Sequence, residues 1–80
     1  MQVSLASQNG VLFSGNADFV VVPQYNGPLG ILPNHEPLLT TLKQGEVRIV
    51  VGETEQKFGI SSGFLSIYRN EIEVAVDVPH

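Results

Sequence analysis

Short stretches of this 80-residue chain alternate between apolar and polar residues, and turn residues separate one stretch from the next. A period of two places the apolar side chains on one face of a strand, whereas a helix requires a period of about 3.6. Signals for a helix are nearly absent, so the chain is predicted to be all-β. The alternating apolar positions are Val3 and Leu5, Val47, Ile49 and Val51, Phe58 and Ile60, and Ile72, Val74, Val76 and Val78.

Turn residues recur along the chain and leave runs of roughly five to seven residues between them, which is the usual length of a strand. Many short strands at this spacing indicate a sandwich or a barrel. The run 19–22 is apolar at every position, so we expect an interior strand there. No linker or repeat divides the chain, which predicts one domain over residues 1–80. The predicted turns are Asn9-Gly10, Ser14-Gly15-Asn16, Asn26-Gly27, Gly45, Gly52, Ser62-Gly63 and Arg69-Asn70.

The composition argues against several classes of partner. Eight acidic and four basic residues give a net charge of −4, and the bases are scattered singly, whereas nucleic-acid binding requires clustered Lys and Arg. No apolar run approaches the roughly 20 residues of a membrane span, and the N-terminus does not resemble a signal peptide. Cysteine is absent, which excludes disulfides and thiolate metal sites. A chain of this length buries only roughly 60% of its unfolded surface, which leaves two alternatives open: stabilisation by a partner protein, or an unaided fold.

Residues 27–45 contain three prolines and three glycines in an apolar stretch without a catalytic grouping. Proline fixes φ, and glycine permits positive φ and close backbone approach. A connection stiffened in this way is typical of a docking surface, whereas catalytic loops show convergent ionisable groups. The segment therefore predicts a protein that functions through binding to a partner.

Residues 59–63 match the G-x-S-x-G pattern of a nucleophile elbow, with Ser61 as the serine. That pattern requires a strand that turns sharply into a helix. Here an alternating run follows at 64–68, and the only histidines available as a base are His35 and His80. A turn between two strands is the preferred interpretation, and a small hydrolase is the alternative.

Other possible sites are incomplete as well. His35-Glu36 begins an H-E-x-x-H pattern, but Leu39 stands where the second histidine is needed and Pro37 would interrupt the helix. Residues 27–30 lack the G-K-[ST] of a phosphate-binding loop. Acidic residues at 71, 73 and 77 are typical of a solvated strand face. We therefore predict no catalytic residues, no metal site and no cofactor.

Residues 30–40, GILPNHEPLLT, closely resemble the G-I-x-P-x-H-x-P-L-L-T signature of the epsilon subunit of rotary ATP synthases. The resemblance continues along the chain in the same order. VLFSG at 11–15 is similar to an early F-S-G strand end, and LKQGEVRI at 42–49 is similar to an L-K-x-G-x-x-R-I hairpin. SSGFL at 61–65 is similar to S-G-G-F-L, and 70–76 resemble the final strand.

This resemblance implies a two-sheet antiparallel β-sandwich and a non-catalytic role in the central stalk. The family joins the gamma subunit to the ring of c subunits and helps to couple ion-driven rotation to ATP synthesis. It implies gamma contacts at Ser7, His35 and Thr40. It implies that Tyr25, Asn26, Gly27 and Pro28 form the turn that faces the c-ring.

The resemblance also has departures. Pro28 stands where the family commonly has an acidic residue, and Asn34 stands where glycine is common. Asparagine tolerates a left-handed backbone better than other substitutes. The sequence ends at His80, before the C-terminal helical hairpin that most relatives carry, and as presented we expect neither ATP binding through that hairpin nor inhibition by it. The implied location is peripheral, at the cytoplasmic face of the bacterial inner membrane or the stromal side of the thylakoid.

A ligand-binding β module, for example one that holds a carbohydrate, is a further hypothesis from a different class. Such modules usually display exposed aromatic side chains. Only Tyr25 and Tyr68 are candidates here, and the chain has no tryptophan.

Overall fold

A computed structural model describes residues 1–79; His80, considered above as a catalytic base, lies outside them. No helix occurs in the described part, which confirms the all-β prediction. The strands are β1 (Gln2–Ser7), β2 (Gly10–Asn16), β3 (Phe19–Gln24), β4 (Gly27–Ile31), β5 (Leu38–Leu42), β6 (Gly45–Val51), β7 (Thr54–Ile60), β8 (Ser62–Tyr68) and β9 (Glu71–Asp77).

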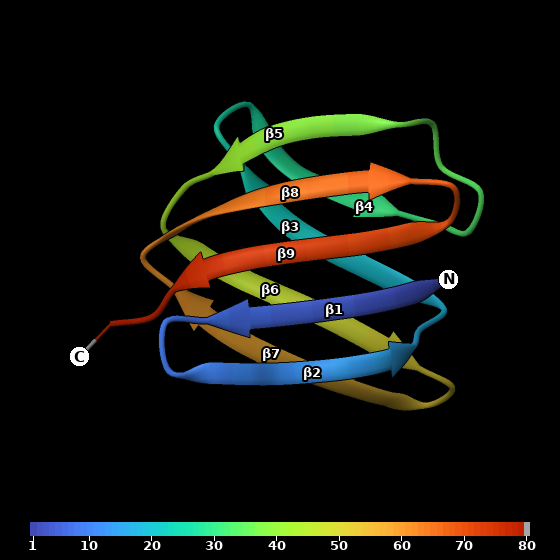
Figure 1. Ribbon diagram of the computed structural model, residues 1–80, viewed down its shortest axis with the longest axis horizontal. Coiled ribbons are helices and arrows are strands. Elements are labelled where there is room, and N and C mark those ends of the chain that lie inside the picture. The colour runs from blue at the N-terminus through green and yellow to red at the C-terminus, as the bar shows by residue number, and fades with distance from the viewer. Residues whose placement is uncertain (80) are drawn as a thin grey trace.

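The strands form two layers (Figure 1). The five-stranded sheet has the order β2-β1-β9-β8-β5, and the four-stranded sheet behind it has the order β4-β3-β6-β7. The interior position of β3 confirms the prediction from its apolar run. The two-sheet sandwich is also confirmed, and the barrel alternative is wrong.

One strand pairing departs from the predicted antiparallel arrangement. Strands β1 and β9 run parallel, with Val3 opposite Ile72 and Leu5 opposite Val74. The other six pairings are antiparallel. Antiparallel neighbours can be joined by tight turns, whereas β1 and β9 lie at opposite ends of the sequence and need no direct connection.

The core lies between the sheets and is entirely apolar among the described residues. Almost all of the alternating apolar positions point into it. The exception is Val51, which is 41% exposed because it lies at the end of β6, beside the Gly52 turn. The fully buried large side chains are Leu5, Ile31, Leu42, Ile49, Ile60, Leu65, Ile67, Ile72, Val3, Val20, Val22 and Val47.

Three predicted turns are displaced, the simplest case being Gly45, which begins β6 after a bend at Gln44. Strand β2 continues through Ser14-Gly15-Asn16, and the chain reverses at Ala17 and Asp18 instead. Asp18 stabilises this reversal, because its backbone N–H donates to the Val50 carbonyl and its carboxylate accepts a bond of 2.7 Å from the Gly52 N–H. Ser62-Gly63 belongs to β8, and only Ser61 separates this strand from β7.

The sandwich has two ends, which differ in the connections they carry (Figure 1). We name the first the His35 end: it carries the 32–37 loop, the Arg69-Asn70 turn and the start of β1. The second, the Tyr25 end, carries the turn at Tyr25 and Asn26 and the ends of β1, β5 and β9. No helix long and apolar enough to cross a membrane is found in residues 1–79.

Candidate functional site

The structure removes the catalytic interpretation of Ser61. This residue lies between two strands, and its hydroxyl donates to the Asp77 carbonyl at 3.0 Å. No helix follows it, so the nucleophile elbow does not form. His35 lies at the opposite end of the sandwich from Ser61 (Figure 1). The hydrolase hypothesis is therefore wrong.

His35 and Glu36 lie in the loop between β4 and β5, where a zinc helix of H-E-x-x-H type cannot form. Within residues 1–79, no three His, Cys, Asp or Glu side chains are gathered as metal ligands would be. The acidic residues of β9 alternate with buried ones and point outward, as predicted for a solvated face.

The His35 loop is an outward-facing irregular segment. Leu32 is 61% exposed and His35 is half-buried. Asn34 has a φ of 66°, so the left-handed backbone expected from its replacement of glycine is confirmed. Its N–H donates to the Asn70 side-chain oxygen at 2.9 Å. The His35 Nδ1 lies 2.7 Å from the Glu36 carbonyl oxygen.

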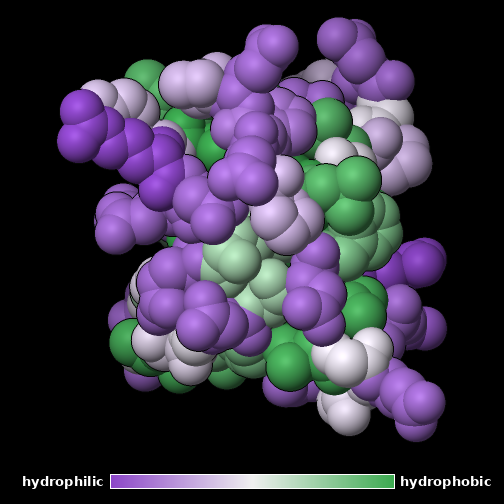
Figure 2. Space-filling model, turned by 90° about the vertical axis from the view of Figure 1, so that its right-hand side faces the viewer, coloured by the Kyte–Doolittle hydropathy of each residue, from purple (hydrophilic) through white to green (hydrophobic). Residues whose placement is uncertain are grey.

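Figure 2 looks onto the His35 end. Hydrophilic residues project over most of this end, and hydrophobic atoms show between them. Arg69 lies here too, with its guanidinium carbon 5.2 Å from the centre of the Tyr68 ring. Such a position over the ring face favours a cation–π interaction. This end of the sandwich therefore presents a mixed polar and apolar surface.

Ser7 and Thr40 are engaged within the domain. The Ser7 hydroxyl accepts from the Asn9 N–H at 3.1 Å, within the β1–β2 turn. The Thr40 hydroxyl accepts from the Gln24 amide at 3.4 Å. Thr40 is half-buried and alternates with the exposed residues Leu39 and Thr41. Its neighbours on β5 are therefore better placed than Thr40 to contact a partner.

The three predicted gamma contacts do not form one cluster. Ser7 lies at the Tyr25 end, whereas the His35 loop lies at the other end. Thr40 lies within β5, and β9 and β8 separate this strand from β1. What these residues share is their sheet: two are on strands of the five-stranded sheet, and the His35 loop leads into β5.

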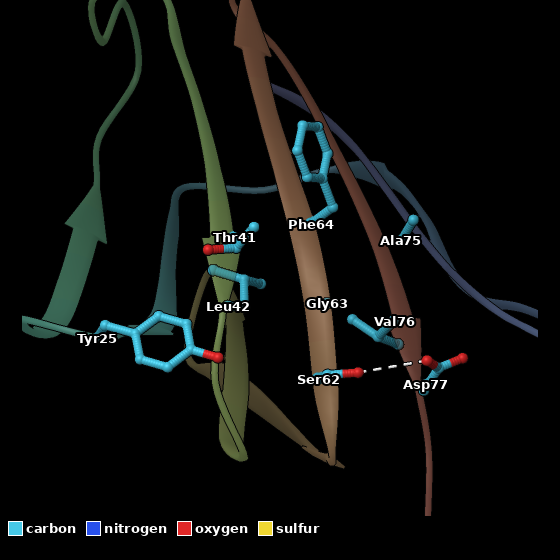
Figure 3. A pocket seen from close by; sticks show the side chains of 9 residues that line it. All are labelled: Tyr25, Thr41, Leu42, Ser62, Gly63, Phe64, Ala75, Val76 and Asp77. Carbon is cyan, nitrogen blue, oxygen red and sulfur yellow. Dashed lines mark hydrogen bonds between the residues drawn. The ribbon is translucent and has the colours of Figure 1, made fainter.

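Tyr25, Asn26, Gly27 and Pro28 do lie together, at the turn from β3 to β4 and the start of β4. The Tyr25 ring is 69% exposed, and Gly27 has a φ of 120°, which favours glycine. An open depression of about 430 Å³ lies beside this turn. Figure 3 shows Tyr25 at one side of it and Ser62, hydrogen-bonded to Asp77, at the other.

Sequence reasoning missed the outer face of the five-stranded sheet. Large apolar side chains point outward here: Leu39 is 69% exposed, Val11 68% and Phe64 45%. Leu39 and Phe64 line one shallow depression of about 510 Å³ together with small residues and Glu73. We name this surface the outer strip; it consists of Val11, Ala6, Ala75, Phe64 and Leu39.

The strand registers bring the outer strip together. Val11 pairs with Ala6, Ala6 with Ala75 and Ala75 with Phe64, in one row across four strands. The signal was present in the sequence, because Phe64 and Leu39 occupy outward positions where polar residues are typical. The strand order that aligns these residues with the rest of the strip could not be predicted from the sequence.

The two tyrosines of the ligand-module hypothesis do not form a platform. Tyr25 lies at one end of the sandwich, and Tyr68 closes β8 at the other end. Such modules usually display exposed aromatic side chains on one sheet face or loop, and these two rings share neither. The arrangement therefore gives this hypothesis no support.

Comparison with known proteins decides the family. The family described as "ATP synthase, Delta/Epsilon chain, beta-sandwich domain" matches residues 1–79. The chain belongs to this family.

Individual members agree in sequence over nearly the whole chain. The chain is 46% identical to the ATP synthase epsilon chain of Hydrogenovibrio crunogenus, over 96% of its own length and 54% of that protein. It is 40% identical to the epsilon chain of Desulforamulus reducens, over 95% of its own length and 58% of that protein. It thus spans little more than half the length of these relatives.

Solved structures share the fold. A chain in the central stalk/c-ring structure of the Tetrahymena thermophila mitochondrial ATP synthase superposes with a TM-score of 0.84 and 18% identity, covering 96% of this chain and 63% of that one. A chain of the Euglena gracilis mitochondrial ATP synthase gives 0.86 and 18%, covering 92% and 48%. These two chains therefore share the two-layer fold described above.

Proposed function

We propose that this domain is a non-catalytic part of the central stalk of a rotary ATP synthase. It joins the gamma subunit to the ring of c subunits and couples ion-driven rotation to ATP synthesis. Membership of the epsilon family supports this role. The observation that carries it is the exposed apolar face of the five-stranded sheet together with the exposed turn at Tyr25. The two regions adjoin, because Phe64 and Ala75 line both the outer depression and the depression beside Tyr25.

We place the gamma subunit on the outer strip and its margin. Leu39 and Phe64 supply apolar anchors, of the kind that dominate interface energetics. Ser7 and His35 lie at the margin of this sheet, where polar contacts surround the apolar centre. Thr40 lies on the edge strand β5, with its hydroxyl hydrogen-bonded by Gln24 of the other sheet.

The charge of this sheet defines its partner further. No Lys or Arg occurs in its five strands, whereas Glu73 lines the outer depression. The complementary surface on gamma is therefore apolar at its centre and carries basic residues opposite β9, since complementary charges steer binding and fix its register.

We place the c-ring at the Tyr25 end. Tyr25 has a large exposed ring with a polar hydroxyl, which suits contact with polar loops. Gly27 and Pro28 keep the start of β4 beside this turn free of long side chains. The domain then lies outside the lipid as a peripheral part of the complex, at the cytoplasmic face of the bacterial inner membrane or, alternatively, the stromal side of the thylakoid.

Calorimetry with gamma from the same organism tests this proposal. The 80-residue chain is expected to bind gamma, and gamma is expected to raise its melting temperature, because only the folded domain offers the docking face. Absence of binding, or an unchanged melting temperature at saturating gamma, contradicts the proposed function.

A matched pair of variants locates the surface. Thr41 and Thr54 are both exposed, but Thr41 pairs with Phe64 beside the outer strip, whereas Thr54 begins β7 in the other sheet. Thr41→Asp is expected to weaken gamma binding about 10-fold or more through a buried unpaired charge. Thr54→Asp is expected to bind as the parent does. Equal affinities for the two variants place gamma elsewhere.

A further inference from the structure

Asn70 connects three segments that are far apart in the sequence. It lies in the β8–β9 turn with a φ of 62°, and Arg69 before it has a φ of 50°. Its side-chain oxygen accepts the Asn34 N–H at 2.9 Å, across 36 residues. Its backbone carbonyl accepts the Gln2 N–H at 3.1 Å, at the start of β1.

The two prolines of the His35 loop restrict the backbone of most of its residues, but not of the two in the middle. Pro33 and Pro37 fix their own φ angles, and each also restricts the residue before it, here Leu32 and Glu36. Residues 34 and 35 remain unrestricted by proline. The first of them, Asn34, donates its N–H to the Asn70 side-chain oxygen.

This bond is the loop's one hydrogen-bonded connection to another element within residues 1–79. The His35 ring bonds only to the neighbouring Glu36 carbonyl. Without Asn70, the segment between the two prolines has no external hydrogen bond to hold it. The conformation of the loop thus depends on a side chain from a different turn.

We propose that Asn70 is a positioning residue: it holds the His35 loop in the conformation that docks against gamma. This inference rests on the proposed gamma interaction. A loop held before docking loses less entropy when it binds. Asparagine suits the position because it tolerates a left-handed backbone and carries an acceptor oxygen.

Three substitutions in the 80-residue chain test the inference. Asn70→Gly keeps the left-handed turn and the backbone carbonyl but removes the side-chain acceptor. Asn70→Asp retains an acceptor oxygen and serves as the conservative rescue. Arg69→Gly is the matched control, because it places glycine at the neighbouring left-handed position and leaves the bond to Asn34 intact.

Amide hydrogen exchange measured by NMR reports the bond directly. In Asn70→Gly the Asn34 amide is expected to exchange about 10-fold faster or more, because local opening exposes it. Asn70→Asp and Arg69→Gly are expected to keep the protection of the parent. Unchanged Asn34 protection in Asn70→Gly overturns the inference.

Calorimetry with gamma reports the docking role. Asn70→Gly is expected to bind about 5- to 10-fold more weakly, the cost of fixing roughly one residue, with a melting temperature within a few degrees of the parent. Asn70→Asp restores the affinity. Parent affinity in Asn70→Gly, despite faster exchange, overturns the positioning role while the proposed function stands. If the parent also fails to bind gamma, both the proposed function and the positioning role of Asn70 are contradicted. The exchange data then still show whether Asn70 holds the loop.

Discussion

The outer faces of the two sheets differ in the side chains that they expose to solvent. The four-stranded sheet carries paired charges, with Arg48 3.4 Å from Glu46 and Lys57 3.7 Å from Glu55. The five-stranded sheet has no basic residue in its strands and exposes Leu39 and Phe64. Mixed charges on a sheet face keep it soluble and disfavour association with other proteins. Contiguous exposed apolar side chains, by contrast, mark an interaction surface. The contrast favours the five-stranded sheet as the face that binds a partner.

The sharpest test of this contrast is a double substitution on the outer strip. Leu39→Asp with Phe64→Asp removes both apolar anchors and adds charge to an acidic face. We expect gamma binding to weaken by at least about 100-fold, or roughly 3 kcal/mol, as for a central interface cluster. Calorimetry measures this, and Lys57→Asp on the other sheet is the control. A double variant that keeps its affinity contradicts the assignment of this face.

A matched pair of glycines compares the internal packing of the two sheets. A Cβ on Gly63 in β8 would lie 2.9 Å from the Ala75 carbonyl oxygen, whereas one on Gly59 in β7 has nothing within 4 Å. Gly63→Ala is expected to lower the free energy of unfolding by about 1–3 kcal/mol through overpacking. Gly59→Ala is expected to be near neutral. Urea denaturation measures the free energy of unfolding of both variants. Equal stabilities would contradict the tight packing of β8 on β9.

Polar contacts at the margin of the five-stranded sheet should matter less than its apolar centre. Combining His35→Ala with Thr40→Ala is expected to cost about 1 kcal/mol of gamma affinity, since marginal contacts are weaker than central ones. Titration calorimetry provides the comparison. A loss larger than that of the outer-strip double variant would reverse the order of the two regions.

The smallest effect is expected on the four-stranded sheet. Arg48→Ala breaks an exposed ion pair, whose side chains are 49% and 47% exposed. Such pairs contribute roughly 0–1 kcal/mol and are screened by salt. We expect little change in stability and none in gamma affinity, in low and high salt alike. A clear loss of gamma binding would show that this face also docks.

Local patterns were sufficient to predict the strands and the class of fold. The alternation identified the core positions of β1 and β9 and most of those of β6. The apolar run predicted that β3 lies in the interior of its sheet. Asn34 was expected to be left-handed and is. These features depend on neighbours a few residues apart, which a single sequence displays.

Features that depend on strand order were not predictable in the same way. The parallel pairing of β1 with β9, and the row that joins Val11 to Phe64, arise from contacts between distant residues. Alternation states which face a side chain occupies, but not which strand lies beside it. The role of Asn70 was hidden for the same reason, since its partner Asn34 lies 36 positions away.

The parallel pairing of β1 and β9 has a consequence for how the domain forms. Strand β9 comes last of the nine but lies between β1 and β8, so it joins the β1–β2 hairpin to the β8–β5 pair. A nascent chain that has delivered only its first eight strands leaves this sheet in two separate pieces with bare edges. Assembly of this sheet must wait for residues 71–77 to leave the ribosome, and until then one edge of β1 and one edge of β8 have no partner strand.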